Sequence, residues 1–102
     1  MQKAKIELLK VLRETRELLA LPDNDFAWSC WDDSEEALTE FDQLVANIES
    51  DRFFDLSKLS FLFAPTAPIQ EVSISSGWGR EFVDVSAKFD SALAAYQREI
   101  QI

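Results

Sequence analysis

The chain has 102 residues, of which 47% are apolar, and carries a formal net charge of −9 with no histidine and a single cysteine. Its length suits one helical domain spanning residues 1–102, and its apolar content excludes a disordered chain. The excess of negative charge excludes a nucleic-acid binder, because an acidic surface repels phosphate groups.

The first predicted element is an amphipathic helix over about residues 2–20. In the stretch KIELLKVLRETRELLAL, apolar residues recur mainly every three or four positions, and Lys and Arg cover the opposite face. Pro22 ends this helix, because the residue before a proline resists helical geometry. Residues 22–31 then predict an irregular connection, in which Asp23, Asn24 and Asp25 favour turns.

Two further helices are predicted in the middle of the chain. Asp32 or Asp33, each followed three residues later by a glutamate, predicts the capped start of the first of them. Its apolar repeat fades near Ser50. A short helix is expected over residues 55–63, and Pro65 ends it.

The segment APIQEVSISSGWG contains conflicting signals. Val72 and Ile74 alternate with serines, as in a strand. Pro68, however, suits a first helical turn, and Gly77 suits the position just past a helix end. A lone strand would lack a pairing partner, so we expect one or two helical turns here. A final helix with apolar steps of three and four is predicted over about Gly79–Ile100.

Together these elements predict an all-α fold. We expect a compact bundle of four to five helices, with long first and last helices and short middle helices. The first and last helices should pack antiparallel against each other. No internal repeat or low-complexity tract interrupts the chain.

The sequence also bears on the location of the protein. No apolar run approaches the ~20 residues that cross a bilayer. The start, MQKAKIELLK, shows no signal-peptide core, and a single cysteine fits a reducing compartment. We therefore expect a cytoplasmic protein that binds neither membrane nor nucleic acid.

Most residues of common catalytic sites are absent from the sequence. Without histidine the chain lacks the commonest general base and the commonest transition-metal ligand, and one cysteine cannot form a zinc site. We expect no catalytic residue, no metal ligand and no cofactor.

A magnesium-dependent phosphohydrolase is the alternative, because Mg²⁺ prefers carboxylate oxygens. Glu36 and Glu40 stand one turn apart beside Glu35, and Glu81 and Asp84 share a face of the last predicted helix. These pairs loosely resemble the acidic motifs of the all-α nucleotide pyrophosphohydrolases, and the resemblance implies a Mg²⁺ site for nucleotide phosphates. The first cluster is one residue longer than that motif. In the competing interpretation these acids favour helix starts or are solvated.

The stretch DNDFAWSCWDD places large aromatic side chains between pairs of carboxylates. Phe26, Trp28 and Trp31 are expected either to cover one end of the bundle or to anchor a partner. We favour core roles for Trp28 and Trp31, as for Trp78, because large aromatics are mostly buried.

The negative charge is concentrated in the middle third of the chain. Residues 22–55 contain eleven acidic side chains and one basic side chain, whereas residues 1–21 carry +2 and residues 56–102 carry −1. Helix starts need only two or three acids, each worth under ~1 kcal/mol. The remaining acids repel one another, so they favour a surface that attracts basic groups.

Two longer motifs add a resemblance to these local signals. The pieces PDNDFAWSCWDDSEEAL (22–38) and FAPTAPIQEVSISSGWGREF (63–82) resemble a family of small bacterial proteins with the pattern PDNDFxWSxW…FAPTxPxQExSxSSGWG. The resemblance implies a bacterial source rather than an activity. A likeness of type, without a shared motif, relates the chain to the small, helical, acidic immunity proteins that neutralise colicin nucleases.

The sequence therefore predicts an acidic protein-binding module that is not an enzyme. Its partner is expected to be a basic protein such as a toxin domain, and its role that of an immunity or antitoxin-like inhibitor. A homo-oligomer is also expected if the basic outer face of the first helix meets the acidic segment of a neighbour. The candidate partner-binding residues are Asp23, Asp25, Phe26, Trp28, Asp32, Asp33, Glu35, Glu36, Glu40 and Asp42.

Overall fold

The computed structural model describes residues 3–27, 29, 31–50, 56–64 and 67–100. These residues form five helices and no strand: α1 (Lys3–Leu19), α2 (Ser34–Glu49), α3 (Leu56–Leu62), α4 (Pro68–Ser76) and α5 (Gly79–Ile100). The prediction of an all-α bundle is confirmed. α2 lies within the bounds predicted for it and, with 16 residues against 17 in α1, is nearly as long as the first helix. Of the middle helices, which were expected to be short, only α3 and α4 are short.

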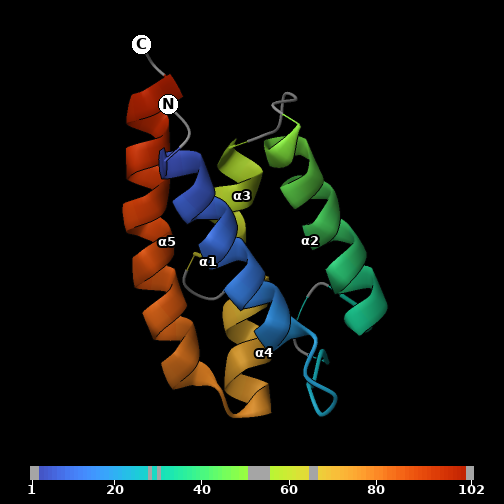
Figure 1. Ribbon diagram of the computed structural model, residues 1–102. Helices are drawn as coiled ribbons and strands as arrows, with labels where there is room; N and C mark the ends of the chain where they lie inside the picture. The colour runs from blue at the N-terminus through green and yellow to red at the C-terminus, as the bar shows by residue number, and fades with distance from the viewer. Residues whose placement is uncertain (1–2, 28, 30, 51–55, 65–66, 101–102) are drawn as a thin grey trace.

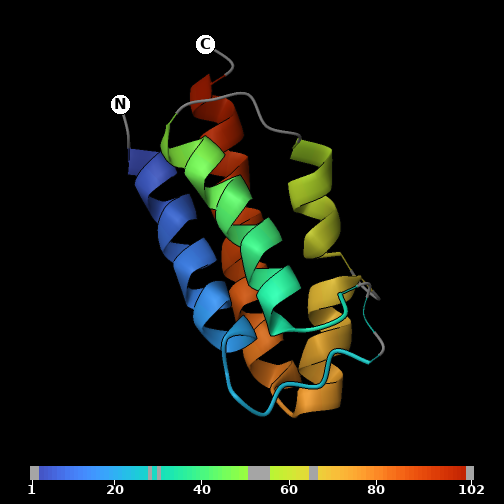
Figure 2. The same ribbon diagram turned by 90° about the vertical axis from the view of Figure 1, so that its right-hand side faces the viewer.

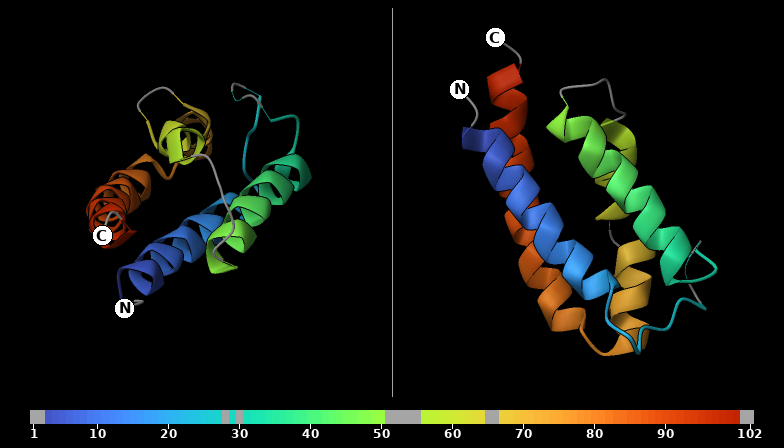
Figure 3. Two further views of the ribbon diagram at one scale, coloured as in Figure 1. Left: turned by 90° about the horizontal axis from the view of Figure 1, so that it is seen from above. Right: turned by 45° about the vertical axis from the view of Figure 1, so that its right-hand side comes forward.

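The helices stand in four antiparallel columns (Figure 1). α1 and α2 run in opposite directions, α3 and α4 follow each other down a third column, and α5 returns beside α1 (Figure 2). Seen from above, α1 and α5 form one side of the bundle, while α2 and the α3–α4 column form the opposite side (Figure 3). As predicted, α1 and α5 pack antiparallel, and both ends of the chain lie at the same end of the bundle.

Apolar stripes at helical spacing bring these columns together. α1 buries residues at Leu8, Leu12 and Leu19, all fully inaccessible, and α2 buries Phe41 and Ile48 in the same way. Removing each such side chain from water contributes about 1.5–3 kcal/mol. α5, which has 22 residues, joins this core through the apolar stripe that its steps of three and four predicted. The stripe consists of Phe82, Val85, Phe89, Leu93 and Tyr96.

Stacked aromatic rings and bonded hydroxyls complete the interior. The rings of Phe63 and Phe89 stack with centroids 3.9 Å apart and planes within 9°. Thr15 and Ser73 are fully buried, and their hydroxyls donate to the Val11 and Gln70 carbonyls of the preceding turn at 3.0 and 2.7 Å. Neither hydroxyl is therefore left unsatisfied in the core.

The ambiguous segment is helical, as the turn chemistry predicted. Pro68 occupies the first turn of α4, and Gly77 ends it in the left-handed region at φ 85°. The Trp78 N–H then closes the helix end by donating to the Ser73 carbonyl at 2.9 Å. The alternation of Val72 and Ile74 with serines therefore does not mark one face of a strand. In α4 Val72 faces the core at 0% exposure, while Ile74 points outward and is 64% exposed.

Candidate functional site

The connection between α1 and α2 is tied to the corner between α4 and α5. The Asn24 side-chain amide donates to the Leu18 and Leu19 carbonyls at 2.8 and 2.9 Å, which caps the C-terminal end of α1. The same side chain accepts a hydrogen bond from Trp78 Nε1 at 2.8 Å. The Asp25 N–H donates to Ser76 Oγ at 2.8 Å. The two motifs singled out in the sequence thus meet and fasten one end of the bundle.

The described aromatics of this region are core residues. Trp31 is 2% exposed and Trp78 is 4% exposed, which confirms the roles favoured for them. Phe26 is 8% exposed, so it takes the core role and presents little surface as an anchor. Trp28, the other candidate anchor, lies outside the described residues.

The start of α2 carries a group of acids at the surface. Asp33 is the cap: its Oδ1 accepts from the Glu36 N–H at 2.9 Å, which decides between the two predicted starts. Asp32, Glu35 and Glu36 are exposed, and within the described residues none of these three carboxylates forms an ion pair. Glu40 is half-buried and accepts a hydrogen bond from Trp31 Nε1 at 2.6 Å.

These acids line two adjoining hollows. A hollow of about 450 Å³ is bounded by Asp32, Asp33, Glu35, Glu36, Thr39, Glu40 and Gln43. A second hollow, of about 610 Å³, is bounded by Ala20, Leu21, Pro22, Asn24, Asp25, Phe26, Ala27, Asp32, Asp33 and Ser34. Asp32 and Asp33 belong to both, and no described residue lining either hollow is basic. We call the five acids Asp32, Asp33, Glu35, Glu36 and Glu40 the acidic end.

The acids further along α2 are paired with α1. Arg16 donates to both oxygens of Asp42, at 2.6 and 3.0 Å. The hydrogen bond and the charge of Asp42 raise the pKa of Arg16 above its ordinary value, because both favour the charged guanidinium. Arg13 meets Glu49 at 2.9 Å. Asp42 was predicted to bind a partner, but it lies in an intramolecular pair.

Asp23 and Asp25 lie in the connection before the acidic end. Both are exposed. Asp25 Oδ1 accepts from the Ala27 N–H at 2.9 Å, which is the local turn that favours aspartate at such positions. Asp25 also lines the second hollow, whereas Asp23 lines neither hollow.

The acids proposed for a magnesium site are not brought together. Within the described ranges, no three side chains of His, Cys, Asp or Glu are placed to hold a metal ion. Glu35, Glu36 and Glu40 lie on α2, whereas Glu81 and Asp84 lie on α5, which is on the other side of α1. The alternative metal site is therefore not assembled by these residues.

Asn24 and Ser76 were not assigned these roles from the sequence. An asparagine two residues after a helix-ending proline is a cue for side-chain capping, but its bond to Trp78 spans 54 positions. No local pattern predicts a contact of that separation.

Comparisons with known proteins add no relative to this picture. No protein-family model matches the chain, and no curated protein or solved structure is significantly similar to it. In the part of the chain that the structure describes, no helix is both long and apolar enough to cross a bilayer.

Proposed function

We propose that the protein is a binding module that captures a basic protein at its acidic end. The observation that carries this proposal is the unmatched charge of Asp32, Glu35 and Glu36 around two hollows without a basic residue among the described lining. A partner that brings Lys or Arg into these hollows relieves the repulsion between the carboxylates.

Hydrogen bonds hold the backbone around the acidic end in place. The loop that leads to it is bonded to α1 and to the α4–α5 corner through Asn24, and α2 starts from a capped residue. A preorganised surface loses little entropy on binding, so a larger share of the electrostatic attraction appears as affinity.

The charge pattern also favours rapid association. A field from clustered carboxylates steers a basic partner toward the surface and raises the association rate, an effect that salt screens. A small acidic inhibitor of the immunity or antitoxin type uses this property, because it must reach a basic toxin domain before the toxin acts. We propose that role for this chain in a bacterial cytoplasm.

Capture from a lysate of the source cells, with two variants of equal charge, tests the proposal. The acidic-end variant carries Asp32→Asn, Glu35→Gln and Glu36→Gln, and it keeps the Asp33 cap. The control variant carries Glu17→Gln, Asp84→Asn and Asp90→Asn, which are exposed acids on α1 and α5. Both variants have a net charge three units less negative than −9.

We expect a basic protein that binds the wild type and the control variant but is lost from the acidic-end variant. Its release should follow rising salt, because 0.5 M NaCl shortens the Debye length to roughly 4 Å. A gene beside this one that encodes a large secreted protein with a basic C-terminal domain would support the inhibitor role. Equal loss from both variants would show only an effect of net charge and would refute the acidic end as the site.

A further inference from the structure

The second hollow, of about 610 Å³, is lined by apolar as well as acidic side chains. Three of its lining residues, Ala20, Leu21 and Pro22, are consecutive in the chain and apolar, and all three are exposed. An exposed run of this kind is unfavourable in water and is expected only where it serves binding. Asp32 and Asp33 line the same hollow, so apolar surface and negative charge meet there.

Leu21 is the largest of these exposed apolar side chains, with 43% of its surface accessible. Its backbone is held in a turn, because the Leu21 N–H donates to the Leu18 carbonyl at 3.3 Å and its own carbonyl accepts from the Asn24 N–H at 3.4 Å. The Asn24 side chain also caps the end of α1 beside it. The Leu21 backbone is therefore in position before a partner binds, and little entropy is lost in ordering it.

The acidic surface continues from this hollow along α2. Asp32 and Asp33 line both hollows, so the charged surface adjoins the apolar run. The first hollow, of about 450 Å³, is lined by residues of α2 from Glu35 to Gln43. These two positions are eight residues apart on the helix, which corresponds to roughly 12 Å, or about two helical turns.

We propose that the partner of the acidic end presents an amphipathic basic segment. An apolar side chain at one end of the segment packs against Leu21 in the second hollow. Lysine or arginine side chains over the next two helical turns lie in the first hollow, beside Glu35 and Glu36. This inference rests on the proposed function, because it takes the acidic end as the binding site and specifies the chemistry of the partner.

Both halves of the site are needed to select this segment over other occupants. A wholly polar polycation leaves the exposed apolar run at Leu21 in water. A neutral apolar segment covers that run but removes water from Asp32 and Asp33 without supplying a cation. A second copy of this chain adds a net charge of −9 to a surface that is already negative. A basic segment with one apolar end satisfies both the apolar and the acidic side chains.

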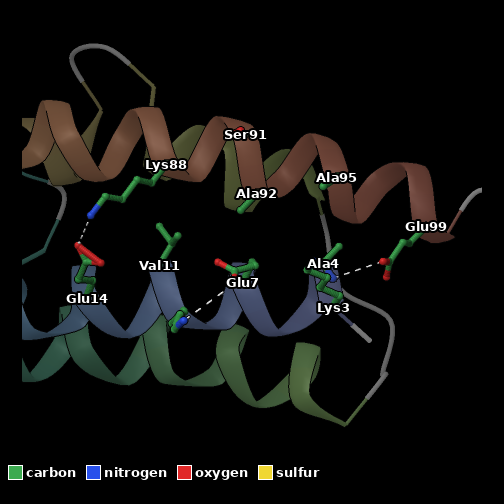
Figure 4. A pocket seen from close by; sticks show the side chains of 11 residues that line it. Lys3, Ala4, Glu7, Val11, Glu14, Lys88, Ser91, Ala92, Ala95 and Glu99 are labelled. Atoms are coloured by element: carbon green, nitrogen blue, oxygen red, sulfur yellow. Dashed lines mark hydrogen bonds and ion pairs between the residues drawn. The ribbon is translucent and has the colours of Figure 1, made fainter. Parts of the chain in front are cut away.

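The larger groove between α1 and α5 does not offer this combination (Figure 4). It encloses about 700 Å³, but charged side chains along it meet partners within the chain. Lys88 Nζ lies 3.0 Å from Glu14 Oε1, and Lys10 Nζ lies 4.0 Å from Glu7 Oε1. A basic segment in that groove would meet lysines as well as glutamates, so it gains little there.

Amide NMR titrations of the full chain with matched peptides test the inference. The peptides are soluble and helical, carry the same lysines and arginines over two turns, and differ in one terminal residue of the basic face. That residue is leucine in one peptide and serine in the other. A second leucine–serine pair carries the change at the opposite end, so that both directions of the peptide chain are tested.

In one of the two pairs, we expect the leucine peptide to bind about fivefold to tenfold more tightly than the serine peptide, because its leucine removes apolar surface from water. The leucine peptide should shift the signals of residues 20–27 together with those of residues 31–40. The serine peptide should shift mainly residues 31–40. The ratio between the two affinities should persist as NaCl is raised, because salt screens the charges of both peptides equally.

Two variants of the protein connect this difference to Leu21. Leu21→Ser should remove the advantage of the leucine peptide and leave binding of the serine peptide unchanged. The control is Ile6→Ser, which replaces a 56% exposed side chain near the other end of α1 and should keep the advantage. Circular dichroism checks that each variant is folded. If Leu21→Ser is unfolded, the comparison of peptides on the wild type decides the question alone.

The outcomes separate this inference from the proposed function. Equal affinities within both peptide pairs, with shifts at residues 31–40, would overturn the apolar contact and leave the acidic end as the site of a basic partner. Loss of the leucine advantage in both Leu21→Ser and Ile6→Ser would also overturn it. Absence of binding by every peptide, or shifts centred on residues 3–14 and 88–99, would overturn the inference and the proposed function together.

Discussion

The two ends of α2 carry the same kind of side chain in opposite situations. In its second half, Asp42 and Glu49 face α1 and are paired with Arg16 and Arg13. At its start, Asp32, Glu35 and Glu36 border hollows whose described lining contains no basic residue. One helix therefore holds acids that serve the fold and acids that the fold leaves unmatched.

This difference shows that a count of charges is a poor guide to a binding surface. The eleven acids of residues 22–55 form one block in the sequence. In the folded chain, cations from α1 neutralise the part of the block that lies beside them. The part that remains is the part for which an external partner has to be sought.

The largest effect on stability is expected from a substitution in the loop that leads to the acidic end. Replacing Asn24 with alanine removes two hydrogen bonds to the end of α1 and leaves Trp78 Nε1 without its acceptor in a buried site. We expect this change to lower the free energy of unfolding by about 2–3 kcal/mol, measured by urea denaturation. The control is Asp23→Ala, an exposed neighbour, which should change it by less than about 0.5 kcal/mol. Equal effects of the two changes would contradict the role of Asn24.

Two substitutions of Asp33 distinguish its capping role from its charge, and their expected effect on stability is smaller. Asp33→Ala removes the acceptor that caps α2 and should cost about 1 kcal/mol of unfolding free energy. Asp33→Asn removes the same charge but keeps an acceptor, so the stability should stay close to that of the wild type. Thermal denaturation of both variants checks this prediction. If Asp33→Asn were as unstable as Asp33→Ala, the charge rather than the cap would stabilise the helix start.

The paired end of α2 is expected to give the smallest effect. Arg16→Gln breaks an exposed pair with Asp42 and should lower the unfolding free energy by about 0.5–1 kcal/mol. Arg80→Gln makes the same change in charge in the first turn of α5, where a cation opposes the helix dipole, so it should be neutral or slightly stabilising.

A double-mutant cycle with Asp42→Asn isolates the pair itself. The coupling between Arg16 and Asp42 should account for most of the loss seen in Arg16→Gln. A coupling close to zero would mean that Arg16 does not stabilise Asp42, and the contrast between paired and unpaired acids along α2 would then be wrong.

Most of the fold could be predicted from local signals. Apolar spacing placed the helices, Pro22 and Gly77 marked two ends, and Asp33 was one of two residues expected to cap α2. Each of these signals acts within a few residues of the chain, where helix formation itself is decided. The helical prediction for the segment around Val72 was correct for the same reason. Pro68 and Gly77, which mark a helix start and a helix end, were stronger signals than an alternation of two apolar residues.

The candidate site could be predicted only in outline. Its acids were recognised, but the sequence did not show that Asp42 pairs with Arg16, 26 positions away. It also did not show that Glu40 accepts a bond from Trp31, or that Phe26 is buried. These outcomes depend on which helix packs beside which, and no short pattern contains that information.

The most direct test follows the amide NMR signals of the wild type as a basic peptide is added at low salt. The probe is a soluble helical peptide rich in lysine and arginine. We expect the signals of residues 31–40 to shift first and most, while those of residues 42–49 on the same helix, which include the paired Asp42 and Glu49, change little. Equal shifts along the whole of α2, or larger shifts on α5, would contradict the claim that the start of α2 is where positive charge is received.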